Sequence, residues 1–339
     1  METTDPKIIA ALIAAAASLI VSIIGTLWGR KNQKDLETLK SELADERAES
    51  DARRDYEYDA RKRLYEECEP LLFQLIELSE NALYRIYSLA RTARNGNLAP
   101  ETGWLSSDGS YYLISTIYNL MAPMVIYKLI HRRLTIIDLT VDSLINMQYL
   151  LAKYLNISFT EHHALAKEYE PIVEYEPDTE NWDRKRKEQP WKYWRQGLAI
   201  GRLDNAVEAL IVRDSAGHLS YSSFGEFESE YFTSGSELQS RFAFVVDIFH
   251  DFHPKTRPVL WRILILQAHI CQGIMRTRQM KIAETVENFK PLKTFSTSER
   301  QRFDWRQPEE NVTDDEVLVQ PFEVAKNYLQ RNLGALLIE

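Results

Sequence analysis

The feature that most constrains this chain is an uninterrupted apolar stretch near its N-terminus, from Ile8 to Trp28. Its 21 residues carry no charge, and ten of them are Ile, Leu or Val. As a helix rising about 1.5 Å per residue, the stretch is about 30 Å long, which matches the hydrocarbon core of a bilayer. The ten branched aliphatic side chains supply on the order of -3 to -6 kcal/mol of insertion free energy. We therefore expect residues 1–29 to form a transmembrane anchor.

A cleaved signal peptide is the competing interpretation, but the stretch is longer than a signal-peptide core and continues into Gly29 and Arg30 without a cleavage pattern. Arg30, Lys31 and Lys34 follow the stretch, whereas Lys7 is the one cation before it. Cations flanking a span stay on the cytoplasmic side. We expect a single-pass protein of the cell inner membrane, with its N-terminus outside and its body in the cytoplasm.

Small side chains recur at every fourth position of the apolar stretch, so they line one face of the helix. Such a face lets two membrane helices approach closely and form van der Waals and hydroxyl contacts. An alanine-rich span without a partner is the alternative. The positions through which we expect a homo-oligomer to form are Ala10, Ala14, Ser18, Ser22 and Thr26.

Residues 30–69 are densely charged and contain neither Gly nor Pro, a composition that predicts a helical stalk. Leu36, Leu39 and Leu43 fit the core positions of a coiled coil, but the next two core positions are polar. Pairing would therefore extend over about one heptad. A solvated single helix or a disordered charged linker, above all over residues 45–55, is the alternative.

Residues 70–339 are expected to form one cytoplasmic body of the all-α class, because amphipathic runs of helical spacing dominate and no βαβ alternation occurs. Pro70 suits the first turn of a new or kinked helix, and Asn95-Gly96-Asn97 suits its end. Further helices are predicted over residues 110–133, 134–157, 191–212, 236–253, 257–278 and 322–337.

Three parts of the body depart from a simple amphipathic pattern. Residues 158–190 lose the helical periodicity and are predicted to form a loop excursion. Between Ser215 and Gly235, the alternation of Leu219, Tyr221, Phe224, Phe227 and Tyr231 predicts a small β-hairpin. Residues 259–274 are apolar on nearly all sides, and we expect a central buried helix and not a second span, because the run is short and contains Arg262, Gln267 and His269.

Composition excludes several classes of function. The formal charge of -9 argues against a general nucleic-acid-binding protein, since binding to phosphate needs a basic surface. Cys68 and Cys271 stand alone and predict reduced thiols. The sequence contains no phosphate-binding loop, nucleophile elbow or metalloprotease motif, and it identifies no cofactor.

Two arginine–histidine pairs match the spacing found in helical bacterial ribonucleases of the HEPN type, in which Arg and His position and protonate the phosphate. The pairs are Arg213 with His218 and Arg262 with His269. Pairs at this spacing are also expected by chance in a chain of this composition. A membrane-tethered nuclease or ligand sensor is therefore the alternative function.

Asp247, His250 and Asp251 share a helix face at the end of a predicted helix, and their spacing can present ligands to a divalent metal. The alternative is structural, because histidines in a last helical turn complement the helix dipole and pair with neighbouring aspartates.

A basic and aromatic segment ends the loop excursion. Its cations and indole rings suit anionic lipid headgroups, and they also suit nucleic acid. Packing of the tryptophans on the body, with the cations in solvent, is the third interpretation. The residues are Trp182, Arg184, Lys185, Arg186, Lys187, Trp191, Lys192, Trp194 and Arg195.

The run Arg-Arg-Asp-Tyr-Glu-Tyr-Asp-Ala-Arg-Lys-Arg-Leu-Tyr at residues 53–65, continued to Arg94 behind an N-terminal anchor, resembles uncharacterised bacterial single-pass membrane-anchored helical proteins. The resemblance covers about the first third of the chain and implies no activity. Anchored helical proteins also occur among bacterial defence effectors, which is an analogy of class. We expect a non-enzymatic scaffold or effector that self-associates and meets the lipid bilayer and an unidentified cytoplasmic protein partner.

Overall fold

The structure is a computed structural model that describes residues 6–99, 102–107, 110–133, 139–167, 196–213, 215, 217–278, 289–307 and 315–338. The chain divides into two units, Met1–Lys62 and Arg63–Glu339, which are described separately. The described residues are mostly helical, so the expected all-α class is confirmed.

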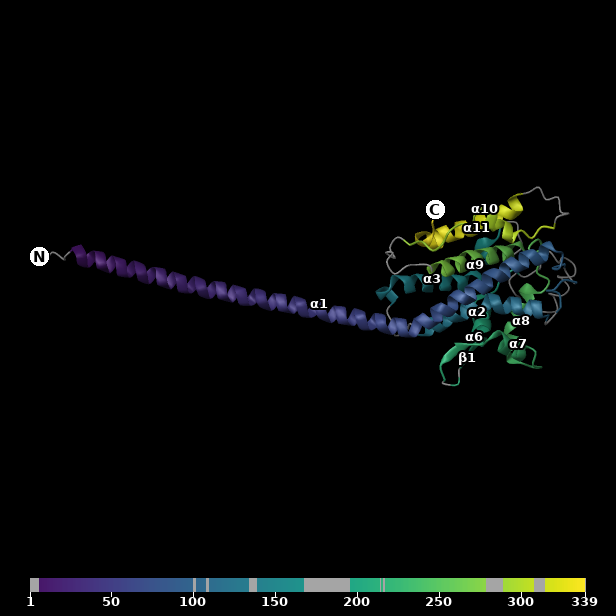
Figure 1. Cartoon of the computed structure of the whole chain (residues 1–339), viewed down its shortest axis with the longest axis horizontal. Helices are drawn as coiled ribbons and strands as arrows, with labels where there is room; N and C mark the ends of the chain where they lie inside the picture. The colour runs from purple at the N-terminus through teal and green to yellow at the C-terminus, as the bar shows by residue number, and fades with distance from the viewer. Residues whose placement is uncertain are drawn as a thin grey trace. The chain divides into compact units, whose positions relative to one another are not determined.

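The first unit is the N-terminal part of one long helix, α1 (Pro6–Arg94) (Figure 1). Every side chain from Lys31 to Asp59 is exposed, including the three leucines of the predicted coiled-coil seam. Neighbouring charges pair along the helix surface: Arg53 Nε lies 3.2 Å from Glu57 Oε1, and Arg54 lies 2.8 Å from Asp51. Such pairs add a few tenths of a kcal/mol each, about 0.2–0.5, to helix stability.

Of the two alternatives expected at Pro70, a new helix or a kinked one, the first is wrong, because α1 continues through this residue. Packing begins earlier than the predicted boundary at residue 69, since Leu64 and Cys68 are already fully buried. The end of α1 was predicted correctly. Gly96 adopts a left-handed φ of 76°, and the Asn97 amide donates to the Thr92 carbonyl (3.0 Å).

The second unit contains, after the C-terminal part of α1, short and medium-length helices and a two-stranded sheet. The α-helices are α2 (Tyr111–Arg133), α3 (Ser143–Ser158), α4 (His162–Leu165), α6 (Ile200–Ala209), α7 (Phe224–Tyr231), α8 (Glu237–Phe249), α9 (Pro258–Thr277), α10 (Thr297–Arg300) and α11 (Asp315–Leu333). The 3₁₀ helices are η2 (Leu139–Val141), η4 (Gln301–Phe303) and η5 (Gly334–Leu336), and the strands are β1 (Ile211–Arg213) and β2 (Leu219–Tyr221).

Helix α9 lies at the centre of this unit, as predicted, and every residue from Val259 to Cys271 is buried. It packs between α3 and α11, while α2 packs on α3, α6 and α8 (Figure 1). By length and composition α2 and α9 are apolar enough to cross a membrane, but 89% and 83% of their apolar windows are buried within the body. Their apolar surfaces are therefore satisfied by other helices of the same chain.

The predicted hairpin is correct in part. Strands β1 and β2 pair in antiparallel register, with Val212 opposite Ser220. The second half of the predicted segment is instead helix α7, which holds Phe224, Phe227 and Tyr231. A capping box starts this helix, because the Ser223 hydroxyl accepts from the Glu226 amide and the Glu226 carboxylate accepts from the Ser223 amide. The aromatic spacing alone did not distinguish helix from strand.

Several of the predicted segments overlap residues that the structure does not describe. The predicted helix over 134–157 corresponds, from residue 139 on, to η2 and α3, and the predicted helix over 191–212 corresponds, from residue 196 on, to α6 and β1. The predicted loop over 158–190 includes α4, and its part from residue 168 on lies outside the described residues.

Replacing Ile263 of α9 by Ala should lower the free energy of unfolding by about 2–5 kcal/mol, because the side chain is fully buried and its loss leaves a cavity. Denaturant unfolding of the full chain in detergent micelles, followed by fluorescence, measures the change. Ile200→Ala is the matched control: this isoleucine is 53% exposed, and its loss should cost less than about 0.5 kcal/mol. Equal effects of both variants would contradict the central position of α9.

Candidate functional site

Helix α9 carries polar side chains in an otherwise apolar surface, and these include one of the predicted arginine–histidine pairs. Arg262, Gln267 and His269 are each 1–2% exposed. A buried polar group is costly unless it forms hydrogen bonds. Gln267 meets this requirement through Ser158, to which its Nε2 donates at 3.1 Å.

Arg262 binds two segments that both pack on α9, namely α4 and α11. Its Nε donates to Gln320 Oε1 of α11 (3.2 Å), and one terminal nitrogen donates to the Leu165 carbonyl at the end of α4 (3.0 Å). The guanidinium therefore joins α4 and α11 to the central helix, where these two helices also contact each other.

His269 binds the segment that precedes α10. Its Nδ1 lies 3.2 Å from the Lys293 carbonyl, and since a carbonyl can only accept, Nδ1 carries the proton. Phe295 and Phe322 surround the ring, with centroids 4.3 Å and 6.0 Å from it. Burial lowers the pKa of His269 to about 4, so the imidazole is neutral near pH 7.

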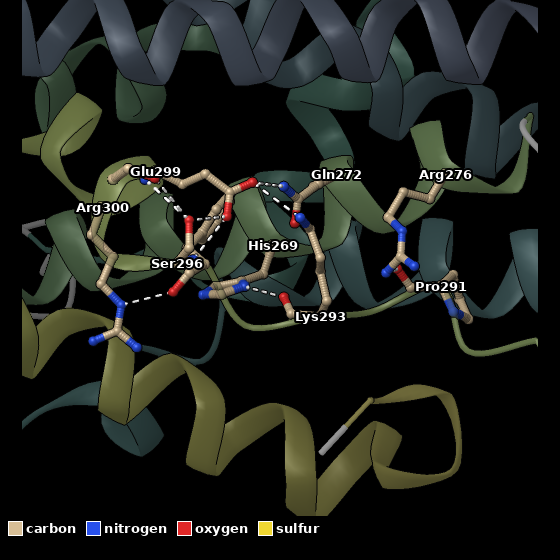
Figure 2. A network of polar contacts seen from close by, with 10 residues as sticks. His269, Gln272, Arg276, Pro291, Lys293, Ser296, Glu299 and Arg300 are labelled. Carbon is tan, nitrogen blue, oxygen red and sulfur yellow. Dashed lines mark hydrogen bonds and ion pairs between the residues drawn. The ribbon is translucent and has the colours of Figure 1, made fainter.

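Glu299 of α10 is the centre of a polar network beside His269 (Figure 2). Its Oε1 lies 3.1 Å from Lys293 Nζ and accepts from Gln272 of α9 at 3.3 Å. Its Oε2 accepts from the Ser296 amide and hydroxyl, both at 2.8 Å. Burial opposes ionisation of this carboxyl, but the bonds from Ser296 and Lys293 outweigh it and lower the pKa of Glu299 to about 2.

Two arginines extend the network along the same segment (Figure 2). Arg276 of α9 donates to the Pro291 carbonyl (2.8 Å), and Arg300 Nε donates to the Phe295 carbonyl (3.0 Å). The segment also joins the C-terminus, because Leu292 pairs with Leu337 in a parallel bridge. The network thus fixes residues 289–303 on α9.

In this arrangement Arg262 and His269 bind other segments of the body to α9. Arg262 donates hydrogen bonds to protein oxygens, and His269 is neutral and packed against aromatic rings. The His269 Nε2 atom is buried and has no hydrogen-bond partner among the described residues. A general acid exchanges a proton with a substrate within hydrogen-bond reach. His269 is 2% exposed, so the surrounding residues would have to move before a substrate could reach this side chain.

The second predicted pair lies on the hairpin. Arg213 is the last residue of β1, and one of its terminal nitrogens donates to the Gly217 carbonyl in the turn (2.9 Å). His218 follows this glycine, and both side chains of the pair are exposed. The guanidinium therefore stabilises the turn in this structure.

The predicted metal-binding residues lie at the end of α8. His250 Nδ1 lies 3.1 Å from Asp251 Oδ2, and His250 Nε2 lies 2.9 Å from the Ser106 carbonyl. Both ring nitrogens thus face protein oxygens, and Asp247 belongs to the helix one turn earlier. Within the ranges that the structure describes, no three His, Cys, Asp or Glu side chains are placed to hold a metal ion.

The remaining predicted sites are the basic and aromatic segment and the small-residue stripe of the apolar stretch. The basic and aromatic segment, from Trp182 to Arg195, lies outside the described residues. The small-residue stripe lies on α1, and each of its side chains is exposed: Ala10, Ala14, Ser18, Ser22 and Thr26. Thr26 Oγ1 donates to the Ser22 carbonyl at 2.6 Å, so its hydroxyl is satisfied within the helix.

Both cysteines are free and buried. Burial raises the pKa of the Cys271 thiol to about 12, and burial also raises the pKa of Cys68. Because the thiolate is the reactive form, neither side chain is an activated nucleophile.

The network of Lys293, Ser296, Glu299 and Arg300 was not predicted from the sequence. One local signal was present: Ser296 and Glu299 have the serine-to-glutamate spacing of a capping box, and α10 begins with one. The approach of Lys293 and Gln272 to the same carboxylate had no local signal. Comparison of the chain with protein families, with curated proteins and with solved structures finds no match.

Acidification should destabilise the body through His269. The folded-state pKa of about 4 lies below the ordinary value of 6.5, so the unfolded chain takes up a proton first as the pH falls. The contribution is complete above about pH 6.5 and is lost towards pH 4, by about 3 kcal/mol for a shift of this size. In His269→Gln, which cannot titrate, this part of the pH dependence should disappear from denaturant unfolding curves.

Ile263→Ala controls for the loss of stability as such, because its effect should be the same at pH 7 and pH 4. If the difference in unfolding free energy between the native chain and His269→Gln did not narrow from pH 7 to pH 4, His269 would not be a buried neutral group.

Proposed function

We propose that this protein is a single-pass membrane-tethered helical scaffold or effector. The apolar stretch of α1 spans the inner membrane, the body lies in the cytoplasm, and the protein acts through self-association and through contact with a protein partner or the membrane. The observation that carries the proposal is an apolar helix segment whose described side chains are exposed.

The exposure of this segment is unusual for its composition. Leu19, Val21 and Trp28 are 63%, 70% and 68% exposed, and the other described residues from Ala10 to Gly29 are exposed as well. Burial of one such large aliphatic side chain contributes about 1.5–3 kcal/mol. The helices α2 and α9 are similarly apolar but gain this energy inside the body. The α1 segment can gain it from lipid or from another chain.

Lipid fits the segment in length and in its flanks. The stretch is one hydrocarbon thickness long, and Lys31 and Lys34 follow it, while Trp28 lies at the interface position favoured by indole rings. The excess of cations on the C-terminal side supports a cytoplasmic body.

Self-association is supported by two features of the same helix. Ala14, Ser18 and Ser22 present an exposed face of small residues, where a second helix can approach closely. Beyond the membrane, Leu36, Leu39 and Leu43 are 53%, 55% and 45% exposed at core positions of a short coiled coil. Pairing of two chains would bury both sets of side chains.

Contact with a partner is supported by aromatic side chains on the surface of the body. Aromatic residues are enriched where protein interfaces form, because they bury a large area at a small entropic cost. Those that are about half exposed or more are Phe73, Tyr84, Trp104, Tyr111 and Phe232. The nuclease alternative has weaker support, since the buried position of Arg262 and His269 leaves no access for RNA.

Placing charges in the apolar stretch should release the protein from the membrane. Ile20→Lys together with Ile23→Lys adds about 2.5–3.5 kcal/mol per lysine to the insertion free energy and removes two favourable side chains. Most of the native protein should remain in the pellet after alkaline extraction of membranes, and most of the double variant should not.

Leu36→Lys together with Leu39→Lys is the matched control, because these leucines lie beyond the predicted membrane edge. This variant should stay in the pellet. Native protein that floats with neither vesicles nor membranes, or a double variant that remains embedded, would overturn the membrane proposal.

Blocking the small-residue face should weaken self-association. Ser18→Leu and Ser22→Leu keep the segment apolar but prevent close approach of two helices. Chemical crosslinking in membranes should show at least a several-fold loss of dimer relative to the native protein. Leu19→Ile and Ile23→Leu, which change neither size nor polarity, should leave the dimer fraction unchanged, and undiminished crosslinking of the serine variants would exclude this face as the contact.

A further inference from the structure

Helix α1 contains a weak point close to the start of the second unit. Pro70 has no backbone N–H, so the Glu66 carbonyl lacks its helical partner, and the proline ring crowds the preceding turn. A proline in a helix interior costs about 3 kcal/mol and commonly kinks or ends the helix. The helix nevertheless continues on both sides of this residue. Contacts from other parts of the body must therefore stabilise the turn.

The first such contact comes from Arg133, the last residue of α2. One of its terminal nitrogens donates to the Glu67 carbonyl (2.7 Å) and also lies 3.1 Å from Glu67 Oε2. Glu67 belongs to the turn that the proline disturbs, and its carbonyl lies next to the one that has lost its partner. The guanidinium thus adds a charged donor to the carbonyl beside the one that has lost its helical donor.

The second contact comes from the start of α3. The Tyr65 hydroxyl donates to Asp142 Oδ2 at 2.6 Å. The other oxygen of this carboxylate accepts from the Ile145 amide (2.9 Å), so Asp142 is also the N-cap of α3. Its capping role fixes the carboxylate in place to receive Tyr65.

Apolar packing differs on the two sides of the proline. Before it, Leu64 and Cys68 are buried, and the other residues from Arg63 to Pro70 are exposed. After it, Leu71, Leu72 and Leu75 begin a continuous buried face. Leu64 and Cys68, together with the polar contacts of Tyr65 and Glu67, thus attach the turn before Pro70 to the body. The helix after Pro70 is part of the core.

We propose that residues 64–70 of α1 are a hinge, and that the pairs Tyr65–Asp142 and Arg133–Glu67 are two latches that hold it closed. Opening the latches releases the turn before Pro70, while residues 71–94 and the core around α9 stay folded. A displacement of the charged part of α1 would then be transmitted through the latches to the end of α2 and the start of α3. The hinge does not depend on whether the apolar stretch lies in a membrane.

Hydrogen exchange of the full chain in detergent micelles, followed by mass spectrometry, tests the hinge. Tyr65→Phe and Arg133→Met each remove one latch and leave the buried face intact. Amides from residue 64 to residue 69 should exchange about tenfold faster in each variant and faster still in the double variant, because exchange follows local opening. Exchange in residues 75–94 and in α9 should not change.

Two further variants separate the latches from general effects. Asp142→Ser keeps an N-cap oxygen for the Ile145 amide but has no second oxygen for Tyr65, so it should behave as Tyr65→Phe does. Pro70→Ala, added to Arg133→Met, restores a donor for the Glu66 carbonyl and should return the slow exchange.

Three outcomes would overturn the proposal. Unchanged exchange at residues 64–69 in the double variant would show that the pairs are not latches. Acceleration spread equally over residues 64–94 and α9 would show that they support the whole body and not a hinge. Failure of Pro70→Ala to slow the exchange would show that the proline is not the weak point.

Discussion

The body is organised by the burial of α9. Its side chains are apolar on all sides, so the helix needs cover from α3, α11 and other elements around its circumference. Its few polar side chains decide which segments lie next to it, because a buried guanidinium or imidazole is tolerated only with hydrogen-bond partners. Arg262 requires the Leu165 carbonyl and Gln320, and His269 requires the Lys293 carbonyl. Burial and hydrogen bonding thus specify one arrangement together.

The same physical requirement applies to the apolar stretch of α1, with a different outcome. The body covers α9 with its own helices, whereas the described side chains between Ala10 and Gly29 are exposed. An apolar helix in this condition needs lipid or a second copy, and a membrane anchor that self-associates satisfies both. The proposed function follows from this difference between two helices of similar composition.

Charged side chains at the ends of helices connect the elements of the body. Arg94 at the end of α1 donates to the carbonyls of Gln301 and Asp304, and Arg133 at the end of α2 donates to the Glu67 carbonyl. In each case a guanidinium at a helix end donates to backbone oxygens of a segment that is distant in sequence. Arg262 and His269, whose spacing in the sequence suggested catalysis, bind backbone carbonyls of other segments in the same way.

The sequence by itself determined what short-range chemistry controls. A run that is apolar on nearly all sides identified α9 as the central helix, and Asn95-Gly96-Asn97 marked the end of α1. The all-α class followed from the helical spacing of apolar residues elsewhere in the body. Tertiary structure decided the rest. Arg262 binds the carbonyl of Leu165, 97 residues away, and Glu299 gathers donors from two segments. The continuation of α1 through Pro70 was likewise not evident from the sequence. The residues that contact this turn, Arg133 and Asp142, lie far from it along the chain. Local patterns report propensity, but the partner of a buried charge depends on which distant segments the fold brings to it.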